Sequence, residues 1–70
     1  MSKTFNLSQR GIEEILKATL RDELAAGHQS SLNELSLAAY AKVIASQEFQ
    51  SVGGLLAAVR TVVRQNEVAP

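Results

Sequence analysis

The chain has 70 residues, seven basic and seven acidic side chains that give a formal net charge of zero, and no cysteine. This length predicts one small domain over residues 1–70, and the missing cysteines exclude disulfides and thiolate metal sites. A hydrophobic content of 46% excludes a disordered chain, and the charge balance disfavours a strongly basic nucleic-acid or membrane-surface protein.

The first element in chain order is an amphipathic helix expected over residues 9–26. Apolar residues recur there at spacings of three and four, which is the pattern of one helix face. Ser8 is the expected N-cap, and Leu7 is placed to pack on Ile12 as a hydrophobic staple. Gly27 is expected to end the helix, because glycine adopts the left-handed conformation common at helix C-termini.

The second helix is expected over residues 32–48. Ser31 and Glu34 have the spacing of a capping box, in which each side chain binds the backbone N–H of the other residue. The helix carries two apolar stripes, roughly 120° apart: Leu32, Leu35, Ala39 and Val43 form one, and Leu37, Tyr40 and Ile44 form the other. A helix that is apolar on two sides is expected to lie between two partners.

The third helix is expected over residues 52–65, where apolar residues again follow the three-four spacing and Ser51 precedes as N-cap. The tail 66–70 is expected to fray. The segment 3–8 alternates polar and apolar residues and predicts a short N-terminal strand. The predicted fold is therefore all-α, with three short helices, a possible short strand, and assembly into a homodimeric helical bundle.

Charged residues are scarce in the middle of the chain. Between Leu24 and Val59 only Glu34, Lys42 and Glu48 are charged, whereas about a quarter of the residues on a soluble surface usually are. Two explanations remain open. The second helix is either the centre of a monomeric three-helix bundle, or one of its stripes faces a second subunit or a different protein. A thin aliphatic core favours the dimer.

The sequence contains little that supports catalysis. His28 is the only histidine and follows the helix-ending Gly27, where a cap or a solvated side chain is the usual role. The sequence has no cysteine nucleophile, G-x-S-x-G elbow or glycine-rich phosphate loop. We therefore predict no enzymatic activity, no catalytic residue, no cofactor, no metal and no small-molecule substrate.

The order of the first elements resembles the ribbon-helix-helix family of dimeric DNA-binding repressors and antitoxins. The similarity covers roughly residues 3–45: an alternating segment, a helix, a loop that carries the Ser31–Glu34 motif, and a second helix. In that family paired strands enter the major groove, and the second helix presents its N-terminal backbone to a phosphate. The DNA contacts that the resemblance implies are Thr4, Asn6, Ser8, Ser31 and Asn33.

The leading prediction is a non-enzymatic regulatory protein that binds and modulates or inhibits another protein through a helical face. This is the type of small accessory protein that phages and mobile elements carry. The predicted partners are a second copy and another protein, and the predicted location is cytoplasmic, without a membrane partner. The interface candidates are Leu37, Tyr40, Ala41 and Ile44. A ribbon-helix-helix transcriptional regulator or antitoxin that binds DNA is the alternative.

Overall fold

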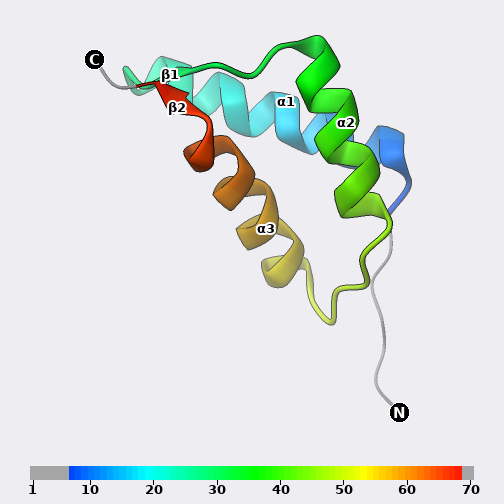
Figure 1. Cartoon of the computed structure of the whole chain (residues 1–70). Helices are drawn as coiled ribbons and strands as arrows, with labels where there is room; N and C mark the ends of the chain where they lie inside the picture. Colours follow the sequence, from blue (N-terminus) through cyan, green and yellow to red (C-terminus); the bar gives the residue numbers. More distant parts are fainter. Residues whose placement is uncertain (1–6, 69–70) are drawn as a thin grey trace.

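A computed structural model describes residues 7–68 of the chain. Its elements in chain order are α1 (Gln9–Ala25), β1 (Gln29–Ser30), α2 (Glu34–Ala45), α3 (Val52–Gln65) and β2 (Glu67–Val68). The helices α2 and α3 both lie on α1, and they diverge from each other as they cross it (Figure 1). Both pack more extensively on α1 than on each other. The central helix is therefore α1, so the alternative that put the second helix at the centre of a three-helix bundle is wrong.

The predicted ends of α1 and α3 are largely confirmed. Ser8 caps α1 by accepting a hydrogen bond from the Gly11 N–H at 3.2 Å, and Ser51 caps α3 by accepting one from the Gly54 N–H at 3.1 Å. Gly27 has a φ of 95°, in the left-handed region that favours glycine. The helix α1 ends at Ala25, one residue before the predicted end.

The helix α2 is shorter than predicted at both ends, and Ser31 is not its cap. The N-cap is Asn33, whose side chain accepts a hydrogen bond from the Ser36 N–H at 2.9 Å. The Ser31 hydroxyl and N–H instead donate to the Asn66 carbonyl, at 3.2 and 2.8 Å. This contact holds Ser31 beside the end of α3. The helix ends at Ala45, where the hydroxyl of the C-cap residue Ser46 donates to the carbonyl of Val43 at 2.6 Å.

We expect Asn33→Ala to lower the free energy of unfolding by about 1 kcal/mol, because an orphan N–H of the first turn of α2 loses its acceptor. Ser31→Ala is the matched comparison. It should cost on the order of 0.5 kcal/mol or less, because the lost hydrogen bond is exposed and the Ser31 N–H still reaches the same carbonyl. Thermal unfolding followed by circular dichroism measures both variants, and a larger loss in Ser31→Ala would contradict the observed cap.

A two-stranded antiparallel sheet joins the middle of the chain to its C-terminal end. Gln29 pairs with Val68, and Ser30 pairs with Glu67. The prediction that the tail frays is therefore wrong for these residues, since β2 is held against the loop that follows α1. Most of the strand predicted at 3–8 lies outside the described residues, and Ser8 serves as the cap of α1 with an extended backbone.

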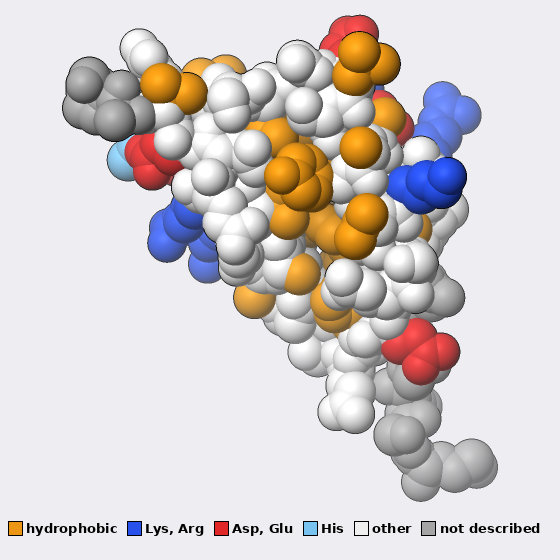
Figure 2. Space-filling model, viewed as in Figure 1, with side chains coloured by type: hydrophobic (Ala, Val, Ile, Leu, Met, Phe, Trp, Pro, Cys, Tyr) orange, Lys and Arg blue, Asp and Glu red, His pale blue; other side chains and the backbone are white. Residues whose placement is uncertain are grey.

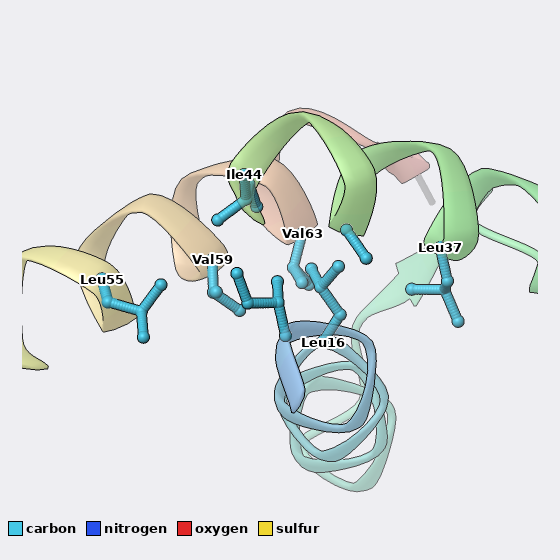
Figure 3. Packing of buried hydrophobic residues seen from close by; sticks show 8 residues of the cluster. Leu16, Leu37, Ile44, Leu55, Val59 and Val63 are labelled. Carbon is cyan, nitrogen blue, oxygen red and sulfur yellow. The ribbon is translucent and has the colours of Figure 1, made fainter. Parts of the chain in front are cut away.

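Eight buried hydrophobic residues from the three helices form the core: Ile12, Leu16, Leu37, Ala41, Ile44, Leu55, Val59 and Val63. In Figure 3, Leu16 rises from α1 between side chains of α2 and α3. Leu7 packs against this cluster, in agreement with the expected staple. None of the helices within residues 7–68 has both the length and the apolar composition needed to cross a membrane.

Candidate functional site

The outer side of α2 exposes apolar residues that nothing in the structure covers. Leu35, Ala39 and Val43 are four residues apart, so they follow one line along the helix. Leu35 is 84% exposed, Val43 is 56% exposed, and Ala39 is also exposed. Of the two predicted stripes, this is the one that faces away from α1. Single exposed apolar residues are common, whereas these three are aligned along one side of one helix.

The apolar surface continues from α2 toward α3. Tyr40 and Val62 are half-buried and both pack against the core cluster, and Ala58 lies one helical turn before Val62. Figure 2 shows hydrophobic side chains gathered between α2 and α3 on the side of the molecule away from α1. We name this surface the α2–α3 face and define it by Leu35, Ala39, Tyr40, Val43, Ala58 and Val62.

The basic side chains of α2 and α3 differ in their position relative to the α2–α3 face. Lys42 is on the side of α2 opposite Tyr40, and Arg60 and Arg64 are on the side of α3 opposite Ala58 and Val62, as the helical repeat requires. Figure 2 shows Lys and Arg side chains beyond the outer edges of both helices. Lys42 therefore borders the face on the α2 side, where Glu34 also lies, whereas Arg60 and Arg64 lie on the far side of α3 from it.

These basic groups differ in their partners. The Arg64 Nε atom lies 4.0 Å from a carboxylate oxygen of Glu23 on α1. Lys42 and Arg60 form no ion pair with any residue between 7 and 68. Their charges are therefore not neutralised by another described side chain.

Three of the four predicted interface residues belong to the core instead. Leu37, Ala41 and Ile44 point toward α1 and are buried within the single chain. The reason is that these three residues share the side of α2 that packs on α1, so the fold of the single chain already covers them. Tyr40 differs from these three, because it is half-buried within the α2–α3 face. Tyr40 and the stripe that contains Leu35 and Val43 therefore keep apolar surface outside the core.

The structure describes three of the five predicted DNA contacts, and each of the three makes a hydrogen bond within the chain. Thr4 and Asn6 lie outside the described residues. Ser8 caps α1 and Asn33 caps α2, so both side-chain oxygens already accept backbone hydrogen bonds. The Ser31 hydroxyl donates to the Asn66 carbonyl.

His28 forms a polar cluster that the sequence did not indicate. Its Nδ1 atom lies 2.5 Å from a carboxylate oxygen of Glu67, and its Nε2 atom lies 3.7 Å from a carboxylate oxygen of Glu23. These contacts tie β2 to the end of α1. The hollow beside them has a volume of about 10 Å³, room for little more than a water molecule. His28 therefore joins the sheet to α1.

Sequence reasoning missed this cluster because Glu67 is 39 residues from His28, and no local pattern links the two. Within residues 7–68, no group of three histidine, cysteine or acidic side chains is arranged to hold a metal ion. Comparisons with protein-family models, curated proteins and solved structures found no match for this chain.

Proposed function

We propose that this is a non-enzymatic, cytoplasmic regulatory protein that binds and modulates another protein through its α2–α3 face. The observation that carries the proposal is the exposed apolar line Leu35, Ala39 and Val43, which continues into the half-buried Tyr40. Small accessory proteins of phages and mobile elements act in this way, by occupying a surface of a larger protein.

The energetics of the face support a binding role. Leu35 and Val43 lie open to water, so a partner that covered them would gain the free energy of burying apolar area, about 25 cal/mol per Å². Tyr40 adds a large ring with a polar hydroxyl, the kind of residue that is enriched at binding hot spots. Helix faces of this type bind amphipathic segments of other proteins.

We expect Val43→Glu to abolish partner binding while the chain stays folded. The new carboxylate would lie within the contact area and would have to lose its hydration, whereas in the free protein it stays in water. Ala18→Glu, at an exposed position of α1, is the matched control with the same added charge. Affinity capture from the host cell, with mass spectrometry and a nuclease-treated arm, gives the result.

The expected outcome is one protein that wild type and Ala18→Glu capture and that Val43→Glu does not, with or without nuclease. Equal capture by wild type, Ala18→Glu and Val43→Glu would contradict the proposal that the partner binds this face. Capture that nuclease abolishes would favour the DNA-binding alternative.

A second copy of the chain is the other protein partner in this proposal. Light scattering of the purified protein over micromolar concentrations measures whether the chain dimerises without any other component. If dimers form and Val43→Glu dissociates them, the second copy occupies the same face.

A further inference from the structure

His28 lies between two carboxylates that belong to different elements, and each of its ring nitrogens faces one of them. The Nδ1 atom lies 2.5 Å from a carboxylate oxygen of Glu67 on β2, and the Nε2 atom lies 3.7 Å from one of Glu23 on α1. The other carboxylate oxygen of Glu23 lies 4.0 Å from the Nε atom of Arg64 on α3. The residues of β1 are uncharged, and α2 contributes no residue to the hollow at this point. The charged groups that line this hollow with His28 are therefore two carboxylates and one guanidinium.

Both ring nitrogens of His28 can donate to these carboxylates only when the imidazole is protonated. A neutral imidazole has one N–H donor, and its other nitrogen is an acceptor. With the proton at Nδ1, the ring donates to Glu67, but the lone pair at Nε2 then faces the carboxylate of Glu23, which can also only accept. The imidazolium donates from both nitrogens and places a positive charge between two negative ones. Histidine ordinarily gains this proton between pH 8 and pH 5, where glutamates are ionised.

His28 belongs to a group of contacts that holds the C-terminal end of the described chain. Beside it, the Asn66 carbonyl accepts hydrogen bonds from the N–H and the hydroxyl of Ser31, at 2.8 and 3.2 Å, and from the hydroxyl of Ser30 at 3.3 Å. We name these residues, together with His28 and Glu67, the clasp. The strands β1 and β2 pair over only two residues each, so the position of β2 depends on the clasp. Within the clasp, the serine hydroxyls and the backbone groups keep the same charge between pH 5 and pH 8.

We propose that the clasp is a pH-sensitive device that holds β2 on α1 when His28 is protonated and loosens as the pH rises toward 8. The protonated ring bridges Glu67 and Glu23, so this contribution is present near pH 5.5 and is lost as the proton leaves. The side chains of His28, Glu67 and Glu23 are 51%, 43% and 22% exposed, so water and salt weaken the attraction. The buried core contains none of these groups. The loss of the proton therefore releases β2 locally and leaves the three helices packed.

A double-mutant cycle in the full chain tests the charge-dependent part of the clasp. It uses wild type, His28→Gln, Glu67→Gln and the double variant, with thermal unfolding measured at pH 5.5 and pH 8. We expect a coupling of about 2–4 °C in Tm at pH 5.5, the size that an exposed ion pair produces in a small domain, and less than about 1 °C at pH 8. Glu13 and Lys17, which are 3.8 Å apart on α1, provide the matched cycle with glutamine substitutions. Their coupling should be the same at both pH values, because neither group titrates in this range.

The release of β2 is measured separately in the unmodified chain. Backbone ¹⁵N relaxation should show the amides of Glu67 and Val68 becoming more mobile at pH 8 than at pH 5.5, while the amides of α1 keep the same order. The proposal is overturned if the coupling of His28 with Glu67 is absent at pH 5.5, is equal at both pH values or is larger at pH 8. An equal loss of coupling between Glu13 and Lys17 would assign the effect to the solvent, and unchanged mobility of β2 would show that the clasp does not open.

Discussion

Leu16→Ala is expected to lower the free energy of unfolding by about 3 kcal/mol, within the range measured for buried leucines. Leu16 is 0% exposed and lies where side chains of all three helices meet (Figure 3). Its truncation leaves a cavity that three helices would have to move to fill. A domain of this size has a total stability of roughly 4–10 kcal/mol, so this one change removes a large part of it.

Chemical denaturation followed by circular dichroism measures this loss. Leu35→Ala is the matched control, because it removes the same atoms from a side chain that is 84% exposed. We expect this control to change stability by less than about 0.5 kcal/mol. Similar losses in the two variants would mean that Leu16 does not occupy the centre of the core.

Ala41→Leu is expected to destabilise the protein by about 2 kcal/mol, because added volume in a filled core forces side chains and backbone apart. Ala41 is 0% exposed and sits on the side of α2 that faces α1. Leucine and alanine are both good helix formers, so the loss reports packing and not helix propensity.

Ala39→Leu makes the same substitution two residues away, on the exposed side of α2. We expect it to leave stability unchanged within about 0.5 kcal/mol. The pair tests which stripe of α2 faces the core, and thermal unfolding of both variants gives the result. If Ala39→Leu were the more destabilising of the two, the orientation of α2 would be wrong.

The three helices could be predicted from the sequence because their signals are local. Apolar spacing along each segment, together with the caps Ser8 and Ser51 and the terminator Gly27, needs no knowledge of distant residues. The start of α2 could not be predicted in the same way. Ser31 and Asn33 are both good caps, and the contact of Ser31 with Asn66, 35 residues away, decides between them.

The candidate site, too, could be predicted only as far as local sequence signals reach. The sequence identified two apolar stripes on α2, but periodicity cannot say which stripe packs on α1. Both stripes have a central alanine, Ala39 in one and Ala41 in the other, so side-chain size along α2 does not decide between them. The answer depends on how α2 fits against residues of α1 that are far away in the sequence. Tyr40 is predicted on the same stripe as Leu37 and Ile44, but it is only half-buried, because it lies on the rim of the core and not at its centre.

The short sheet bears on the order in which the protein folds. Each helix forms from neighbouring residues, whereas the contact between His28 and Glu67 spans 39 residues and that between Ser31 and Asn66 spans 35. Bringing together residues so far apart costs chain entropy before any contact repays it, and β1 and β2 offer only two residues each. The sheet is therefore expected to close after the helices have docked. The sheet then pairs β1, which precedes α2, with β2, which follows α3. The segment that contains both helices thereby becomes a closed loop of the chain.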